Sequence, residues 1–222
     1  ESEIGAFLRT RLDAGLRRIA FLVVPSAVAF LALGDVLAAA LFQTGRFTRA
    51  DSVYVWGILA GSAVGLLAST LGRLYSSAYY ALRDTKTPLW FALVRVVLTT
   101  GLGAAAALFL PRALSLDLKW GAAGLTASAG IAAWVEFTLL RRTLNRRIGR
   151  TGLPAAFLAK LWGSALVAAA AAWGVKLGLG VGHPILLAIA ALVPYGLVYF
   201  GLTMWLAIPE ARTVLETVLR RR

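Results

Sequence analysis

Arg73, Arg95 and Glu136 are the residues of this sequence best suited to chemistry, because each falls inside a long apolar stretch. A charge in the middle of a membrane costs between about 2.5 and more than 10 kcal/mol, so such residues usually face a bundle interior or a water-filled cavity. Arginine holds phosphate oxygens in a bidentate fork and keeps its charge when it is desolvated. We therefore hypothesise an inward-opening polar cavity in which Arg73 and Arg95 meet phosphate and Glu136 supplies the counter-charge.

The helical neighbours of Arg73 favour such a cavity, because they form a polar stripe on an otherwise apolar helix. The stripe consists of Ser62, Ser69, Ser76, Ser77 and Tyr80. At a rise of about 1.5 Å per residue, Arg73 lies roughly 13 Å and Arg95 roughly 10 Å from the nearest expected helix end. The competing interpretation is that both arginines extend to the membrane surface, or pair with Glu136 in a structural role.

Enzymatic chemistry finds little support in the sequence. The chain has one histidine and no cysteine, which leaves no cluster of metal ligands and no set of nucleophile, base and orienting acid. No glycine-rich phosphate-binding motif is present either. We expect a protein that is not an enzyme and that has no cofactor and no metal site.

The composition indicates the fold class. Of the 222 residues, 59% are hydrophobic, and the mean hydropathy is +0.78, which is too apolar for a soluble domain of this size. The apolar blocks are near the length of about 20 residues that a helix needs to cross a membrane. The sequence thus predicts an all-α integral membrane protein. Basic residues flank these blocks, so the net charge of +13 indicates membrane lipids with anionic head groups, and not nucleic acid, as partners.

Six transmembrane helices are expected, at about 19–42, 52–82, 88–110, 120–140, 155–177 and 185–208. Residues 1–18 are expected to form an amphipathic lead-in helix at the membrane surface. Residues 19–150 then hold four of the spans, and residues 151–222 hold the final pair and a basic tail that ends in Arg220, Arg221 and Arg222.

Two features of the spans predict how helices contact one another. Pro25 is expected to kink the first span, which is tolerable if a neighbouring helix bonds the carbonyl that the proline frees. The spacing of Gly57, Gly61 and Gly65 predicts the close approach of another helix to the second span.

The basic residues are distributed unevenly between the two sides of the membrane. Fifteen of the 23 fall on the side that carries both ends of the chain, and five fall on the other. Because cytoplasmic loops are enriched in Lys and Arg, we assign the richer side to the cytoplasm.

Two polar segments between spans contain helix-capping residues. Asp51 is expected to cap the second span, and Asp84 and Thr85 the third, with Pro88 in its first turn. The first segment, Leu41-Phe42-Gln43-Thr44-Gly45-Arg46-Phe47-Thr48-Arg49-Ala50-Asp51, resembles the L-F-x-x-G-x-F-T-x-x-D loop of the MurJ/MviN family. The second segment, Tyr80-Ala81-Leu82-Arg83-Asp84-Thr85-Lys86-Thr87-Pro88, resembles that family's Y-A-L-x-D-T-x-T-P segment. The matching motif residues are Gly45, Phe47, Thr48, Asp51, Asp84, Thr85, Thr87 and Pro88.

The MurJ/MviN family consists of lipid II flippases with fourteen membrane helices, within a larger superfamily of exporters. The resemblance implies that this chain is a C-terminal portion, that its spans are the ninth to the fourteenth, and that a missing N-terminal lobe lies on the same or a partner chain. It implies a place in the bacterial inner membrane and a substrate, lipid II. Alternating access would move this undecaprenyl-diphosphate-linked disaccharide pentapeptide to the outer leaflet for peptidoglycan biosynthesis and the cell wall.

The family's best-supported substrate arginines lie outside this chain, so the cavity residues Arg73, Arg95, Glu136, Ser77 and Tyr80 rest on burial alone. Two alternatives remain. One is another exporter of the superfamily, for a lipid-linked oligosaccharide or a drug, although the two loop segments argue against it. The other is a membrane scaffold that does not transport.

Overall fold

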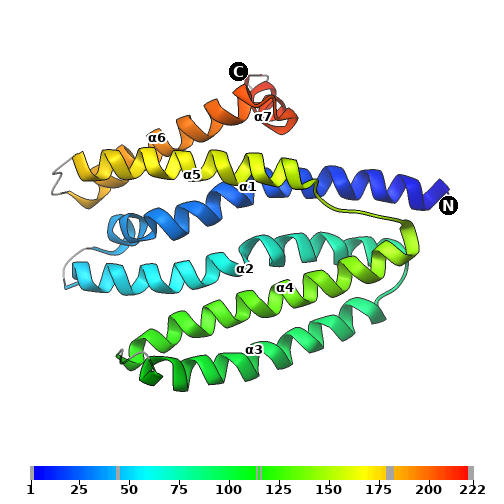
Figure 1. Ribbon diagram of the computed structural model, residues 1–222, viewed down its shortest axis with the longest axis horizontal. Coiled ribbons are helices and arrows are strands. Elements are labelled where there is room, and N and C mark those ends of the chain that lie inside the picture. The colour runs from blue at the N-terminus through cyan, green and yellow to red at the C-terminus, as the bar shows by residue number, and fades with distance from the viewer. Residues whose placement is uncertain (1–2, 44–45, 114, 116, 179–182, 220–222) are drawn as a thin grey trace. The chain divides into compact units, whose positions relative to one another are not determined.

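The computed structural model describes residues 3–43, 46–113, 115, 117–178 and 183–219, and every regular element in these ranges is helical (Figure 1). The elements are α1 (Glu3–Phe42), α2 (Arg49–Ala81), α3 (Lys86–Ala113), the short 3-10 helix η1 (Leu118–Trp120), α4 (Gly121–Ile148), α5 (Ala155–Gly178), α6 (Pro184–Trp205) and α7 (Pro209–Leu219). Helices α1 to α6 are long and apolar enough to cross a membrane, which confirms the predicted all-α membrane fold. Gly45 and Arg220, Arg221 and Arg222 lie outside the described residues.

Several helices extend beyond the expected spans. α1 begins at Glu3, so the lead-in segment and the first span belong to one continuous helix. α4 continues past residue 140, because Leu140, Leu144 and Ile148 form a buried row at four-residue spacing that keeps the arginine-rich end helical. α3 runs through Pro111, past the expected end of its span at residue 110, to Ala113.

The chain forms two compact units. The first consists of Glu1–Ile19 and Gly57–Leu153, and the second of Ala20–Trp56 and Pro154–Arg222. The first unit therefore holds most of α2 together with α3 and α4, while the second holds α5, α6 and α7 with the C-terminal part of α1. The division at residues 18 and 150 that the sequence suggests stays a prediction.

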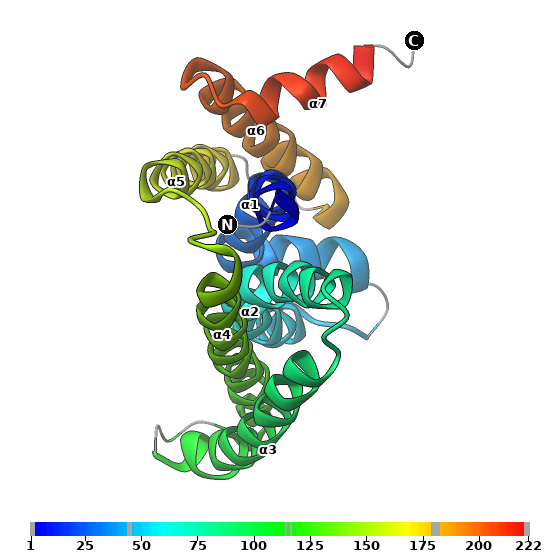
Figure 2. The same ribbon diagram turned by 90° about the vertical axis from the view of Figure 1, so that its right-hand side faces the viewer.

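A glycine crossing of α2 and α4 organises the first unit (Figures 1 and 2). A Cβ atom on Gly130 would lie 2.7 Å from the backbone nitrogen of Gly65, and one on Gly61 would lie 2.6 Å from the carbonyl oxygen of Ala123. Real Cβ atoms do not approach backbone so closely, so only glycine allows this contact. The close approach predicted from the glycine spacing is confirmed, and the partner is α4.

The second unit supplies a hydrogen-bond donor for the backbone carbonyl that Pro25 leaves without one. Proline lacks an N–H, so the carbonyl of Phe21, four residues earlier in α1, has no donor within the helix. The hydroxyl of Tyr199 in α6 donates to this carbonyl at 2.7 Å, and the hydroxyl of Tyr195 donates to the carbonyl of Pro25 at 2.7 Å. The prediction that a neighbouring helix bonds the freed carbonyl is confirmed, and the donor comes from α6.

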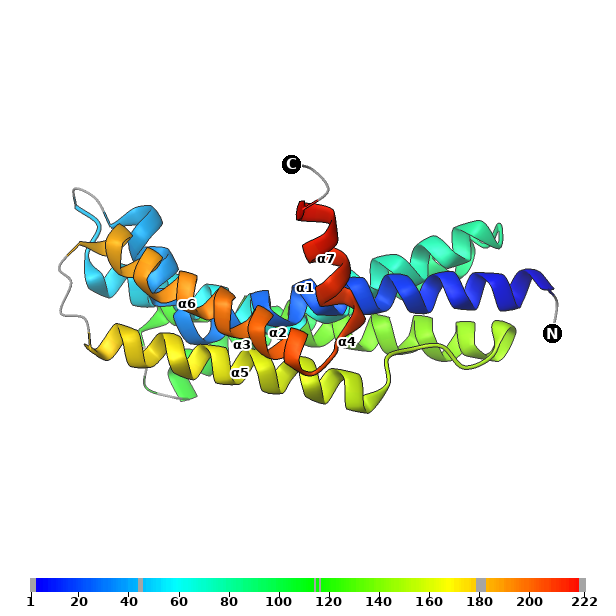
Figure 3. The same ribbon diagram turned by 90° about the horizontal axis from the view of Figure 1, so that it is seen from above.

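The other end of the second unit is held by polar contacts to α1. Lys176 of α5 pairs with Asp35 at 2.6 Å, and both side chains are largely buried. Nearby, the indole N–H of Trp173 donates to the carbonyl of Ala32. The lysine partner of the Asp35 carboxylate lies 141 residues away in the sequence. α5 and α6 form an antiparallel pair, and α7 turns away from the end of α6 (Figure 3).

Gly65→Ala is expected to destabilise the complete protein by about 1–3 kcal/mol, because the new methyl group forces α2 and α4 apart. Gly101→Ala is the matched control, since a Cβ there meets nothing within 4 Å and alanine is the better helix former. Thermal unfolding in detergent measures both. Equal stability of the two variants would show that the crossing tolerates a side chain.

Tyr199→Phe is expected to cost about 1–2 kcal/mol, because the Phe21 carbonyl loses its donor in an apolar setting. In a Pro25→Ala background the cost should shrink, since the new backbone N–H of residue 25 bonds Phe21 within α1. Thermal unfolding of the four variants in this cycle measures the coupling, with the exposed Tyr80→Phe as control. A cost that is the same in both backgrounds contradicts the assigned role of Tyr199.

Candidate anion-binding cavity

A cavity of about 800 Å³ lies within the first unit, among α2, α3 and α4. The residues that line it are Ser69, Gly72, Arg73, Ser76, Ser77, Tyr80, Thr85, Lys86, Pro88, Leu89, Ala92, Arg95 and Glu136. The structure thus brings together all five side chains that the sequence nominates for a cavity. Their function is a separate question, and it depends on how the charges are arranged.

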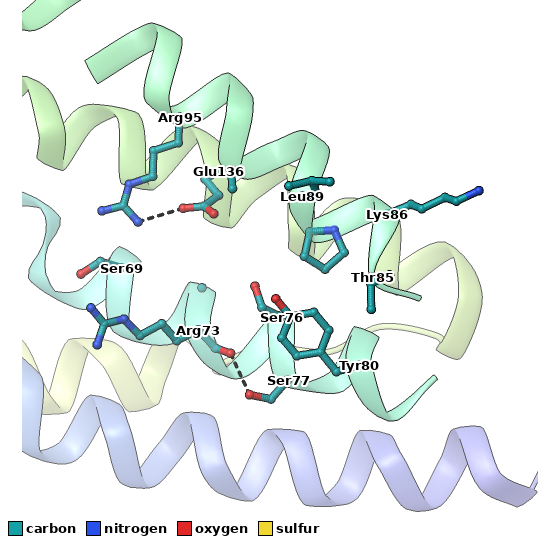
Figure 4. Close-up of a pocket in the computed structure, with 13 residues that line it drawn as sticks. Ser69, Arg73, Ser76, Ser77, Tyr80, Thr85, Lys86, Leu89, Arg95 and Glu136 are labelled. Carbon is teal, nitrogen blue, oxygen red and sulfur yellow. Dashed lines mark hydrogen bonds and ion pairs between the residues drawn. The ribbon is translucent and has the colours of Figure 1, made fainter. Parts of the chain in front are cut away.

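Arg95 and Glu136 form an ion pair across the cavity wall (Figure 4). Nη1 of Arg95, on α3, donates to Oε2 of Glu136, on α4, at 3.0 Å. The Glu136 side chain is only 12% exposed, whereas that of Arg95 is 36% exposed. The pair neutralises two charges inside a span, so the structural pairing that we weighed as an alternative does occur for Arg95.

Arg73 contributes a charge that has no such partner. Its side chain is exposed, and among the described residues its guanidinium group makes no ion pair or hydrogen bond. Figure 4 shows Arg73 and Arg95 extending from α2 and α3 toward the same end of the cavity, with Ser69 between them, while Lys86 points away. The cavity therefore presents one uncompensated arginine beside a neutralised one.

The serines of α2 make the cavity wall polar without adding charge. The Ser77 hydroxyl donates to the carbonyl of Arg73 at 3.0 Å, and the Ser69 hydroxyl donates to the carbonyl of Leu66 at 3.1 Å. Each hydroxyl oxygen keeps its capacity to accept a hydrogen bond from water or from a ligand. Tyr80 is 56% exposed at the same wall. Polar surroundings of this kind lower the cost of keeping an arginine charged within a span.

Asp84 fixes the loop between α2 and α3, beside this cavity. Its carboxylate accepts the backbone N–H of Thr87 at 3.0 Å and the Thr87 hydroxyl at 2.7 Å, which is the geometry of a helix N-cap. Arg147, from the end of α4, pairs with the same carboxylate at 2.6 Å. The bonds from Thr87, with a smaller contribution from Arg147, lower the pKa of Asp84 from 3.8 to about 2.

The expected cap of α3 is confirmed for Asp84 but not for Thr85. The Thr85 hydroxyl makes no hydrogen bond to any described residue, and the side chain instead lines the cavity. Pro88 lies in the first turn of α3, as predicted, and is buried.

The expected cap of α2 is wrong in its details. Thr48, not Asp51, is the N-cap residue, and Asp51 lies in the first turn. The Asp51 carboxylate accepts the backbone N–H of Thr48 at 2.8 Å and its hydroxyl at 2.7 Å, while the Asp51 N–H reaches the Thr48 hydroxyl oxygen at 3.3 Å. This reciprocal arrangement is a capping box. Phe47, just before it, packs on Phe42 with ring centroids 5.9 Å apart.

Sequence reasoning treated Arg147 only as a charge that orients the protein. In the structure it also joins the end of α4 to the loop before α3, and its guanidinium lies over the Tyr79 ring at 5.5 Å. No local signal predicts this role, because the two partners lie 63 residues apart in the sequence.

The fold and the cavity define a multi-pass membrane protein whose spans enclose a charged, polar site. A sequence model of the family described as "Lipid II flippase MurJ" matches residues 3–207. The chain belongs to this family.

Several known proteins are similar to this chain. The "Probable lipid II flippase MurJ" of Rhizobium meliloti (strain 1021) is 32% identical over 124 residues, which are 56% of this chain and 21% of the relative. The "Lipid II flippase MurJ" of Burkholderia cenocepacia is 34% identical over 160 residues, 71% of this chain and 29% of the relative. The chain thus spans less than a third of the length of either.

A solved structure has a similar fold. It is described as "Lipid II flippase MurJ, inward closed conformation", and it aligns with a TM-score of 0.72 and 20% identity. The alignment covers 89% of this chain and 39% of the solved one.

Asp84→Asn is expected to lower the thermal stability of the complete protein at pH 7, because an amide cannot pair with Arg147. The pKa of Asp84 is depressed in the folded state, so its stabilisation is present above pH 4 and is lost as the pH falls through about 2. The stability difference between the native protein and Asp84→Asn should therefore narrow between pH 4 and 2. Thermal unfolding across this range measures it.

Asp117→Asn is the control, because Asp117 forms an exposed pair with Lys119 that contributes little. A difference for Asp84→Asn that stays constant down to pH 2, or one no larger than the control's, would contradict the assigned pairing of Asp84 with Arg147.

Proposed function

We propose that this chain is part of a transporter that moves lipid II, the undecaprenyl-diphosphate-linked peptidoglycan precursor, from the inner to the outer leaflet. The observation that carries the proposal is the exposed Arg73, which has no ion-pair partner among the described residues and lines a cavity of about 800 Å³, in a chain that belongs to the lipid II flippase MurJ family. The named relatives are described as lipid II flippases, which supports the same substrate here.

The chemistry of the cavity suits a diphosphate. Arg73 offers a guanidinium fork that stays charged when water is excluded. Arg95 starts from an ion pair with Glu136, so a phosphate oxygen that binds Arg95 must compete with a carboxylate already in place. Arg73 is therefore the first contact for the diphosphate, and Arg95 is recruited when the Glu136 pair loosens.

Flipping requires no bond to be made or broken, so the proposed protein is a transporter and not an enzyme. The head group passes through a polar cavity, and rocking of one helix bundle against another exposes the cavity to each leaflet in turn. In this proposal the protein lies in the bacterial inner membrane with both ends of this chain in the cytoplasm, as the distribution of Lys and Arg indicates. An N-terminal lobe, on the same or a partner chain, supplies the other wall of the pathway.

Arg73→Gln is expected to reduce flipping at least tenfold, because a charge-assisted contact with phosphate contributes about 1.5–3 kcal/mol. The measurement is the accessibility of lipid II in the outer leaflet of cells that depend on the complete protein. Arg49→Gln is the matched control, since Arg49 is an exposed arginine at the start of the same helix, outside the cavity. Membrane abundance of the variants must be equal.

Normal flipping by Arg73→Gln would remove Arg73 from the proposed site and leave the substrate assignment in place. Failure of the native complete protein to flip lipid II, at normal abundance, would contradict the proposed function and favour another exporter of the superfamily.

A further inference from the structure

The arginines at the end of α4 fall into two groups. Arg141 and Arg147 bind other groups of the protein. Nε of Arg141 donates to the carbonyl of Thr151 at 3.2 Å, and Arg147 pairs with Asp84. Arg142, Arg146 and Arg150 are exposed, and their guanidinium groups make no hydrogen bond or ion pair with any described residue. The second group is available to a ligand.

Arg142 and Arg146 lie one turn apart, on the same face of α4. The face continues into the span, where Ile131 is 51% exposed and Val135 is 36% exposed. Val135 precedes Arg142 by two turns, or about 10 Å along the helix axis. One exposed strip is thus apolar within the span and basic where the helix leaves it.

This strip is separate from the cavity. Glu136, which lines the cavity, lies six residues before Arg142, or about 120° away around the helix at 3.6 residues per turn. Glu136 faces α3 and its Arg95 partner, while Arg142 faces away from that pair. A ligand on the strip would therefore leave the cavity free.

We propose that the strip formed by Ile131, Val135, Arg142 and Arg146 is a binding site for an anionic phospholipid. The two guanidinium groups hold the head-group phosphate, and the acyl chains lie along Val135 and Ile131. Charge complementarity selects the head group, because each basic residue near an anionic surface strengthens binding about fivefold. The apolar half of the strip selects a lipid over free phosphate, since a soluble anion cannot use Val135 or Ile131.

Such a lipid has a mechanical consequence. The same end of α4 holds the α2–α3 loop through Arg147 and Asp84, and that loop contributes Thr85 to the cavity wall. A bound anionic lipid would neutralise the free arginines beside Arg147 and steady the helix end to which the loop is attached. The proposal is independent of the transported substrate and would survive if the substrate were another lipid.

The test is native mass spectrometry of the complete protein in detergent, titrated with phosphatidylglycerol or with phosphatidylcholine. Arg142→Gln/Arg146→Gln is expected to weaken phosphatidylglycerol binding about 25-fold, at about fivefold for each arginine, and to leave phosphatidylcholine binding unchanged. The matched control is Arg46→Gln/Arg49→Gln, which removes the same charge from two exposed arginines elsewhere. Glycerol phosphate should not compete. Equal losses in the two double variants, or none in either, would overturn the proposal.

A second measurement keeps the proposal testable if the double variant does not fold. A photo-crosslinking amino acid at position 135 of the otherwise native protein should capture phosphatidylglycerol in vesicles of phosphatidylglycerol and phosphatidylethanolamine. Capture of another segment of the protein would overturn the proposal, because the strip would then be a contact within the assembled protein. Capture of phosphatidylethanolamine in proportion to its abundance would also overturn it, since the site would then lack selectivity for an anionic lipid.

Discussion

The contact between the backbones of Gly65 and Gly130 is the constraint on which the proposed site depends. α2 and α4 run in the same direction, and contacts along the interface hold their register, from Gly61 beside Ala123 to the Tyr79 hydroxyl on the carbonyl of Leu140. Two turns beyond the crossing, this register places Arg73 on α2 and Glu136 on α4 at one cavity. A side chain at the crossing would separate the two helices. The distance between Arg73 on α2 and the Arg95–Glu136 pair would then change.

The protein satisfies polar groups inside its spans in three ways. Ion pairs join Arg95 to Glu136 and Lys176 to Asp35. Tyrosine and tryptophan side chains donate to main-chain carbonyls of α1, as Tyr199 does to Phe21. Serines bond back to their own helix. Each solution follows from the absence of water in the hydrocarbon region, where an unmade hydrogen bond is costly. The cavity is the exception, because Arg73 has no protein partner among the described residues, and this makes it the functional candidate.

The two segments that link this chain to its family have structural roles at helix starts. Thr48 and Asp51 form a capping box for α2, and Asp84 and Thr87 cap α3. Both motifs thus determine where a span begins and how its loop is held. Arg147 connects the second motif to α4 through its ion pair with Asp84. The motifs identify the family through helix geometry, while the charges that would meet a diphosphate lie deeper in the spans.

The sequence by itself determined the number and approximate positions of the spans, because apolar blocks of bilayer length leave few alternatives. It also determined that Arg73, Arg95 and Glu136 need polar surroundings, since a charge within a span is costly wherever the helices pack. Only the tertiary structure decided which charges pair. Arg95 pairs with Glu136, which lies 41 residues away in the sequence, and Lys176 pairs with Asp35, which lies 141 residues away. It likewise decided that Thr48 and not Asp51 is the cap. Partners so far apart are chosen by helix register and by which faces meet, and a periodic apolar sequence does not specify either.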